Sequence, residues 1–513
     1  MTSFFNPPEI DNEILTSFGA VIAANAERMG DKPALVCGDV TLSWRAFGDQ
    51  VARVSGALQA RGVQRGDMVA SLAENSAAHV VLFAAVVSAG ACMVPLPFSA
   101  TADALRAMIA DSGAQILFAS DTQAGLAAQI GARTVLGLDM VDDWGSNAAP
   151  AAPADVRPQD LFNMIYSSGT TGMPKGIIHD HRFRSRQLGR ITRFGLTEDA
   201  RMLISTPVYS NTTLFGLLPM LTLGATLVIM PKFNVTGFLT LSQDWRVTHT
   251  VLVPVQYMRL MNAPEFGQFD LSSYRCKFST SAPLPGALIA KVMERWPGNL
   301  IEVYGMTEGG VSTALNCGEF PDKWDTVGRA GEGSDLRVID DQGNELPTGE
   351  MGEIVGRSTS MMTGYHNLPD KTAELLWRDE QGRDFIRSGD MGRIDADGFL
   401  QLLDRKKDMI ISGGFNIYAA DLEAVLRAHS DVADVAVIAI PSPDWGETPL
   451  GFVVLNKGAH ISADDLRIWA NDQLGKTQRL SAIELRDDLP RSDIGKVLKR
   501  DLRAPYWPDQ AGA

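Results

Sequence analysis

Short β-branched runs alternate with stretches of helical apolar spacing along most of this chain. Residues 52–60 have the helical spacing, 68–72 read as a strand, and the apolar run 77–94 combines a helix with a second strand. Further extended runs follow at 226–230, 251–253 and 300–303. Apolar strands separated by helices pair in parallel and are covered on both faces, so the pattern predicts an α/β fold with helix-covered sheets.

The run 77–94 is about as long as a short membrane span. It contains His79, Ser88 and Gly90, however, and it stops at Pro95. These residues favour a buried helix that leads into a strand. We therefore expect no membrane span here.

Charge and cysteine usage exclude several classes of protein. Lys and Arg number 46 against 61 Asp and Glu, a net charge of −15, which disfavours binding to nucleic acid or to anionic membranes. The four cysteines form no CxxC pair, so neither a zinc site nor a disulfide framework is indicated. The first residues carry acids and lack the basic and apolar regions of an export signal, and we expect a cytoplasmic protein.

The character of the chain changes near residue 404. Residues 350–403 contain short extended pieces separated by Gly and Asp turns, which predicts a small antiparallel β region. A basic segment follows, then an amphipathic helix at 420–428 and a strand at 432–440. No flexible linker separates the parts, so we predict a hinge between a large domain, 1–404, and a small mobile α+β domain, 405–513.

The most informative motif is YSSGTTGMPKGIIH at 166–179, which follows an apolar strand-like run. Backbone N–H groups and hydroxyls at short spacing suit the binding of phosphate oxygens, and Lys175 adds a cation. Pro174 before Lys175 and Gly176 after it exclude the Walker pattern, which disfavours a P-loop kinase. The candidate phosphate-binding residues are Ser167, Ser168, Gly169, Thr170, Thr171 and Gly172.

Five further motifs occur in order along the chain: STSAPLPG at 279–286, VYGMTEGG at 303–310, RSGDMGRID at 387–395, LLDRKKDMIISGGFNIY at 402–418 and LPRSDIGKVLKR at 489–500. With the first motif they resemble the adenylate-forming superfamily of acyl-CoA synthetases, peptide-synthetase adenylation domains and firefly luciferase. The resemblance extends from Lys32 to Lys496. It implies a ligase that forms an acyl-adenylate from ATP and a carboxylic acid, and then transfers the acyl group to coenzyme A.

The resemblance assigns roles in the large domain. Tyr304 stacks on the adenine, Thr307 contacts the α-phosphate, and Glu308 holds a magnesium ion, whose preference for hard oxygen ligands it satisfies. Gly305 is a further cofactor-binding residue. The wall of the adenine site corresponds to Ser281, Ala282 and Pro283.

Roles in the later motifs follow from the same resemblance. Asp390 accepts hydrogen bonds from both ribose hydroxyls, Arg405 contacts the ribose and Lys407 is the hinge. Lys496 is the mobile cation that stabilises charge during adenylation only. The glycines that let backbone approach the pantetheine arm are Gly413 and Gly414.

The resemblance also locates the acyl pocket, at 209–213, 253–257, 279–282 and 309–312, and none of these stretches contains Lys, Arg, Asp or Glu. An apolar aromatic, alicyclic or medium-chain acid is therefore expected. Ser210 stands where many acyl-CoA synthetases have His. The absence of a carboxylate from 206–216 disfavours an amino acid substrate. The candidate pocket residues are Tyr209, Ser210, Asn211, Val253, Gln256, Gly309 and Gly310.

Several alternatives stay open at this level. A carrier protein could replace coenzyme A as the acceptor, a luciferase-type oxidation is a rarer variation, and a non-catalytic nucleotide-binding regulator belongs to another class. A homodimer is a further expectation. One basic run has no assigned role and fits either an anionic cofactor phosphate or a solvated helix face; its arginines are Arg182, Arg184, Arg186, Arg190 and Arg193.

Overall fold

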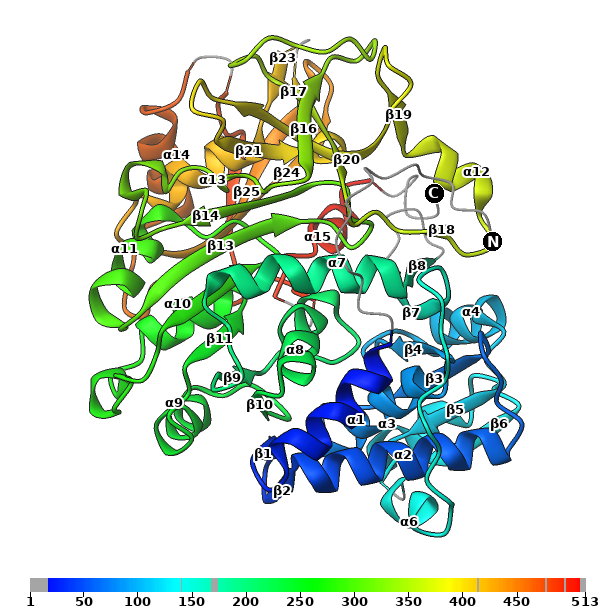
Figure 1. Ribbon diagram of the computed structural model, residues 1–513. Helices are drawn as coiled ribbons and strands as arrows, with labels where there is room; N and C mark the ends of the chain where they lie inside the picture. The colour runs from blue at the N-terminus through cyan, green and yellow to red at the C-terminus, as the bar shows by residue number, and fades with distance from the viewer. Residues whose placement is uncertain are drawn as a thin grey trace. The chain divides into compact units, whose positions relative to one another are not determined.

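The computed structural model describes residues 17–139, 141–167, 174–412, 415–475, 478–492 and 495–507 (Figure 1). They pack as two compact units. The first holds most of the chain up to Leu336 together with Gly356–Ile386, and the second holds Arg337–Val355 and the chain from Arg387 onward. The predicted hinge at 404/405 stays a prediction, because the second unit also includes residues 387–404.

The largest sheet of the first unit has nine strands within the described residues, in the order β15-β14-β13-β12-β11-β9-β10-β1-β2. Neighbours from β13 to β1 run parallel, as the sequence pattern predicted, whereas β2, β14 and β15 pair antiparallel at the two edges. The strands are β1 (Pro33–Cys37), β2 (Val40–Ser43), β9 (Arg201–Ile204), β10 (Thr226–Ile229), β11 (His249–Leu252), β12 (Cys276–Thr280), β13 (Asn299–Gly305), β14 (Ser312–Asn316) and β15 (Arg329–Ala330).

A second sheet of the first unit has seven described strands, in the order β18-β8-β7-β4-β3-β5-β6. Neighbours from β7 to β6 are parallel, and β8 forms an antiparallel hairpin with β7. The strands are β3 (Met68–Leu72), β4 (Cys92–Leu96), β5 (Ile116–Ala119), β6 (Thr134–Gly137), β7 (Leu161–Ser167), β8 (Lys175–Asp180) and β18 (Gly364–Tyr365).

Helices cover these sheets, and α3 (Ala77–Ser88) is buried along its whole length from His79 onward. Ser76 caps α3 by accepting a hydrogen bond from the His79 N–H, and β4 follows, so the buried helix and strand predicted from 77–94 are confirmed. Among the described residues no helix has the length and apolar character to cross a membrane. The other helices are α1 (Phe18–Met29), α2 (Trp44–Ala60), α4 (Ala102–Ser112), α5 (Ala124–Ala127), α6 (Val141–Ser146), α7 (His181–Ile191), α8 (Asn211–Leu223), α9 (Val235–Asp244), α10 (Pro254–Met261), α11 (Gly286–Arg295) and α12 (Pro369–Glu374).

Aromatic side chains fill the space between β12 and the helices beside it. Trp296 is 1% exposed, and Phe266 packs edge-on against it with ring centroids 5.5 Å apart. Tyr274 makes a similar edge contact at 5.0 Å. The buried Lys277 extends over the Trp296 ring and donates hydrogen bonds to the carbonyls of residues 296, 297 and 298. This lysine of β12 therefore satisfies backbone oxygens of residues 296–298, which connect α11 to β13.

The predicted antiparallel β region is present. Its sheet has five described strands, ordered β16-β17-β20-β19 with β21 also paired to β20. Strands β16, β17 and β20 each pass from one unit into the other. The strands are β16 (Ser334–Ile339), β17 (Gly352–Ser358), β19 (Leu376–Arg378), β20 (Asp384–Ile394) and β21 (Leu400–Arg405).

The second unit carries its own sheet, ordered β23-β22-β25-β24 with β26 beside β25 in the described part of the chain. Its core includes Leu422, Val437, Val453 and Leu466, all fully buried. The helix and strand predicted at 420–428 and 432–440 are confirmed as α13 and β24. The elements are β22 (Ile410–Ser412), β23 (Phe415–Ile417), β24 (Val432–Ser442), β25 (Gly446–Leu455), β26 (Ala482–Leu485), α13 (Ala419–Arg427), α14 (Ala463–Asn471) and α15 (Lys499–Arg503).

Candidate active site

Four parallel neighbours of the nine-stranded sheet end at one edge, and predicted site segments follow each of them. These strands are β13, β12, β11 and β9, in that spatial order. The phosphate segment follows Tyr304, the adenine wall begins at Ser281, and the acyl segments begin at Val253 and close to Tyr209. Carboxyl ends of parallel strands share an edge of the sheet, so the topology gathers segments that are far apart in the sequence.

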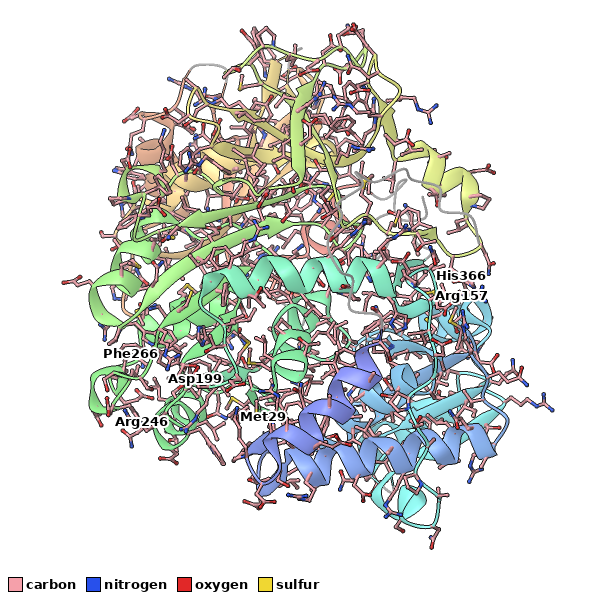
Figure 2. The ribbon with its side chains drawn as sticks, viewed as in Figure 1. Met29, Arg157, Asp199, Arg246, Phe266 and His366 are labelled. Carbon is pink, nitrogen blue, oxygen red and sulfur yellow. The ribbon has the colours of Figure 1, made fainter. Side chains whose placement is uncertain are left out.

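The hairpin of β7 and β8 fixes both ends of the predicted phosphate loop. Ser167 at the end of β7 is in register with Lys175 at the start of β8. The Lys175 ammonium lies 5.0 Å from the centre of the Tyr365 ring, a cation–π contact. His366, which is labelled in Figure 2, donates its backbone N–H to the Gly176 carbonyl. Outside the described residues lie Ser168, Gly169, Thr170, Thr171 and Gly172.

Glu308, the predicted magnesium ligand, is oriented by a tyrosine. The Tyr365 hydroxyl donates to Glu308 Oε1 at 2.8 Å. Burial and the negative charge of Glu308 raise the pKa of Tyr365, so the phenol keeps its proton and stays a donor. Because Lys175 contacts the ring of the same tyrosine, two candidate catalytic residues from separate motifs are brought to one side chain.

The backbone of Thr307 is held by a buried histidine. His179 Nε2 lies 2.7 Å from the Thr307 carbonyl oxygen, so this nitrogen carries the proton and donates. Burial and the nearby Arg184 cation hold the pKa of His179 well below its ordinary value. The imidazole is therefore neutral, and its Nδ1 accepts a hydrogen bond from Arg184 at 2.9 Å.

Gly309 and Gly310 have a backbone reason to be glycine. Both have φ of +76°, a left-handed conformation that residues with a side chain rarely adopt. A Cβ at Gly309 would lie 2.1 Å from the Ser360 carbonyl oxygen, and one at Gly310 would lie 2.7 Å from the Gly356 carbonyl oxygen. The pair makes the turn that follows Thr307 and Glu308, so its first effect is to shape that segment.

The adenine-wall segment is strained and anchored from two sides. Ser281 has φ of +79°, and its hydroxyl pairs with the Thr212 hydroxyl of α8 at 2.6 Å. Glu302 on β13 is 2% exposed and accepts a hydrogen bond from the Leu284 N–H at 2.6 Å. Ala282 and Pro283 lie between these two anchors. Burial raises the pKa of Glu302 to about 8.

Polar side chains of the predicted acyl segments are largely committed to the protein. Ser210 Oγ caps α8 by accepting from the Thr212 N–H. The Asn211 carboxamide oxygen accepts from Arg184 at 2.8 Å. Gln256 accepts from the Val253 N–H and donates to Ser205.

Apolar groups complete these segments. The Tyr209 ring meets Phe98 edge-on, with ring centroids 5.3 Å apart, and Val253 is buried. The segments therefore offer mainly apolar surface to a ligand.

In the second unit, the two predicted ribose residues are already paired. Arg405 Nε lies 3.0 Å from Asp390 Oδ1, across neighbouring strands β20 and β21. The Asp390 side chain is 13% exposed and that of Arg405 is 49% exposed. The Ser388 hydroxyl also accepts from the Asp390 N–H. Strand pairing thus positions a carboxylate and a cation together without a long-range contact.

The predicted hinge residue, Lys407, lies in the short 3₁₀ turn η5 (Lys406–Asp408). Its neighbours are tethered within the second unit, because Lys406 pairs with Asp341 at 2.8 Å and Asp408 pairs with Arg503 at 2.8 Å. Lys496 is exposed, in a turn closed by a bridge between residues 491 and 497. Gly413 and Gly414 lie outside the described residues.

Sequence reasoning missed three residues that shape these segments: Tyr365, Glu302 and Arg184. Glu302 had a possible signal, since an acid stands inside the apolar run LIEVY. Arg184 was singled out only as part of a basic run, and the reading of that run as a solvated helix face is wrong for this residue, which is 1% exposed. Nothing in the motifs pointed to Tyr365.

Comparison with known proteins identifies the family of this chain. Residues 22–366 match the AMP-binding enzyme family, and residues 421–496 match the AMP-binding enzyme C-terminal domain. The chain belongs to the AMP-binding enzyme family.

A feruloyl-CoA synthase from Amycolatopsis sp. is 34% identical and aligned over 91% of this chain and 95% of its own. A fatty acid–[acyl-carrier-protein] ligase, ScoC, from Streptomyces coeruleorubidus is 30% identical over 95% and 96%. The crystal structure of ATP-bound MatB from Rhodopseudomonas palustris matches with a TM-score of 0.85 and 31% identity, over 95% of this chain and 99% of that one.

The chain is an ATP-dependent, AMP-forming acid–CoA ligase of the adenylate-forming superfamily, as predicted. Its cosubstrates are ATP and coenzyme A, and its cofactor is magnesium. The donor set of the ligase fits magnesium, because a magnesium site on nucleotide phosphates needs only one or two protein carboxylates. Glu308, the predicted ligand, would supply one, and a carboxylate that accepts one hydrogen bond from Tyr365 keeps further lone pairs for a cation.

Replacing Tyr365 with Phe tests how far Glu308 depends on its donor. The change removes the hydroxyl but keeps the ring beneath Lys175, and we expect adenylation to fall about 10-fold, with a higher magnesium requirement. Pyrophosphate release measured across magnesium concentrations checks this. Tyr274→Phe is the matched control, because it removes a buried hydroxyl that pairs with Ser242. Equal kinetics in the two variants would contradict the orienting role.

Glu302 makes stability depend on pH. Its folded pKa, about 8, lies above the ordinary glutamate value of 4.5, so the folded state retains a proton that the unfolded state has lost between these pH values. Stability from this group is complete below pH 4.5 and declines as pH rises toward 8. Glu302→Gln keeps the Leu284 hydrogen bond without the titration. We expect the difference in melting temperature, variant minus wild type, to increase from pH 5 to pH 8. A difference that stays constant with pH would refute the assignment.

Proposed function

We propose that the ligase activates an apolar carboxylic acid without further charge, such as an aromatic, alicyclic or medium-chain acid. The observation that carries this proposal is the character of the acyl segments, which contain no Lys, Arg, Asp or Glu. Ser210, Asn211 and Gln256 are hydrogen-bonded within the protein. A second carboxylate or an ammonium group would be buried without a partner, at a cost of several kcal/mol.

Aromatic rings suit the same segments. The Tyr209 ring, packed on Phe98, provides a flat apolar face near the start of α8. The similarity to a feruloyl-CoA synthase supports an aromatic acid as the first candidate. Ser210 is smaller than the His of many relatives of this type, which leaves room for a substituent such as a phenol or methoxy group.

In the first step, an oxygen of the acid attacks the α-phosphorus of ATP, and the bond to pyrophosphate breaks. Negative charge develops on the phosphate oxygens in the transition state, and it is stabilised by hydrogen bonds from Lys175, Thr307 and Lys496. One well-placed donor is worth about 3–4 kcal/mol. Glu308 holds magnesium, which offsets phosphate charge when bound. Tyr304 and residues 281–283 bind the adenine, and Asp390 with Arg405 binds the ribose.

In the second step, the thiol of coenzyme A attacks the acyl carbon and AMP leaves. No side chain has to act as a nucleophile, because the activated group is carried by AMP. We propose that the small domain turns about Lys407 between the steps, withdrawing Lys496 and presenting the backbone at Gly413 and Gly414 to the pantetheine arm. Lys406 and Asp408, on either side, are paired with other residues of the second unit, so a turn at Lys407 would have to preserve or break these ion pairs.

Two alternatives to a coenzyme A ligase remain to be weighed: a ligase with a carrier protein as acceptor, and a non-catalytic regulator. Similarity to a fatty acid–[acyl-carrier-protein] ligase supports a carrier protein as the acceptor in place of coenzyme A. A non-catalytic regulator is disfavoured, because both Lys496 and Glu308 are present in the sequence.

We further propose a cytoplasmic location and a homodimeric state. Cys37, Cys92, Cys276 and Cys317 are all buried and free, which suits a reducing compartment. Cell fractionation and light scattering test the two statements separately.

A panel of acids tests the substrate class. Catalytic efficiency, read as AMP release with and without coenzyme A, is expected to be highest for benzoate-like, cinnamate-like or medium-chain acids and at least about 100-fold lower for dicarboxylic and amino acids. Release that needs a carrier protein would transfer the acceptor role to that alternative. A preference for a dicarboxylic or amino acid would overturn the proposed pocket.

Lys496→Ala separates the two half-reactions. Because Lys496 is proposed to act in adenylation only, we expect acid-dependent pyrophosphate release to fall at least about 100-fold. Thioester formation from preformed acyl-adenylate should stay within a few-fold of the wild type. Single-turnover assays of both steps check this, with the exposed Lys457→Ala as a control. Equal losses in both steps would show that Lys496 is not specific to the first.

A further inference from the structure

Arg184 is a buried cation at the meeting point of several candidate site segments. It lies on α7 and is 1% exposed. Nε donates to Asn163 Oδ1 at 2.8 Å, and Nη1 donates to Gln187 Oε1 at 2.6 Å and to Asn211 Oδ1 at 2.8 Å. Nη2 donates to His179 Nδ1 at 2.9 Å. The planar fork of a guanidinium can bond all these acceptors at once, and an ammonium cannot.

None of these four partners carries a negative charge. The ion pairs formed among the described residues do not include Arg184, and burial lowers the pKa of its guanidinium to about 9. A buried cation without a carboxylate partner carries a desolvation penalty. A well-packed apolar side chain of similar volume would avoid that penalty. The penalty is offset here by hydrogen bonds to neutral groups and by a cation–π contact with the Phe183 ring, whose centre lies 5.3 Å from the guanidinium carbon. No carboxylate contributes, which points to a use for this geometry.

The partners of Arg184 belong to three segments with separate tasks. Asn163 lies on β7, which leads into the phosphate loop. His179 links Arg184 to the phosphate segment, because its Nε2 donates to the Thr307 carbonyl at 2.7 Å. Asn211 is the first residue of α8, in the acyl segment. A shift of any one segment would therefore break a hydrogen bond of the same guanidinium.

We propose that Arg184 is a positioning residue, whose forked hydrogen bonds fix the acyl segment at Asn211 relative to the phosphate segment at Thr307. This inference rests on the roles proposed above for Asn211 and Thr307. In-line attack requires the acid and the α-phosphate to meet within a narrow range of distance and angle. Arg184 acts on that alignment through Asn211 and His179, and it does not touch the reacting atoms.

Lys277 provides an internal comparison. Lys277 is also fully buried and forms no ion pair with an acid among the described residues, but its acceptors are the three successive carbonyls of residues 296–298. Those carbonyls lie between α11 and β13 and belong to none of the predicted site segments. Losing Lys277 therefore perturbs the fold without moving the acyl and phosphate segments apart.

The experiment compares Arg184→Met, Arg184→Lys and Lys277→Met, assayed well below their melting temperatures. For Arg184→Met we expect the KM values for both acid and ATP to rise and kcat/KM for adenylation to fall roughly 10- to 100-fold. Arg184→Lys keeps the charge but loses the fork, and should fall by a similar factor. Lys277→Met should lower the melting temperature and leave both KM values within about twofold.

Three outcomes would overturn the proposal: wild-type constants in Arg184→Met, full activity in Arg184→Lys, or the same kinetic losses in Lys277→Met. If Arg184→Met does not fold, Asn211→Leu tests the link from its other end. A rise in the KM for ATP as well as for acid supports the link, and an unchanged KM for ATP contradicts it. Failure of the proposed function is distinct, since the wild type would then activate no acid of the proposed class.

Discussion

The parallel pairing of β9, β11, β12 and β13 is the constraint on which the candidate site depends. Because the register is parallel, each strand delivers the segment after it to the same edge of the sheet. Acyl, adenine and phosphate segments then meet, although they come from chain positions as distant as Tyr209 and Glu308. The strands are buried, so their ends are rigid, and the loops after them can carry polar groups without weakening the core.

The sequence predicted the strands, the helices between them and the motif residues, because each depends on local pattern. The helix after Ser76 is one example, since serine is a common N-cap residue. The turn at Gly309 and Gly310 is another, since glycine is the residue that adopts a positive φ most readily. Contacts between distant segments could not be predicted in this way. The hydroxyl of Tyr365 reaches Glu308 across 57 positions and His179 reaches Thr307 across 128, and no local spacing encodes either pairing.

Arg184, Lys277 and Glu302 show how differently this interior treats buried ionisable groups. Lys277 bonds three carbonyls and has a pKa lowered to about 7 by burial, and Glu302 has one raised to about 8, so both are close to neutral near physiological pH. Burial also lowers the pKa of Arg184, to about 9, but its guanidinium remains charged at neutral pH. Of the three, only Arg184 keeps a full charge, and its partners are the side chains that connect site segments.

Ser281, directly after the rigid strand β12, has a strained backbone. A positive φ at a residue with a side chain costs of order 1–3 kcal/mol unless its surroundings determine it. Here the hydroxyl pair with Thr212 ties that residue to the start of α8, and Glu302 fixes the segment again at Leu284. The adenine wall is thus linked to the acyl segment by one hydrogen bond and to β13 by another. Two anchors of this kind hold the predicted adenine wall in one conformation, and such preorganisation would reduce the ordering that nucleotide binding requires.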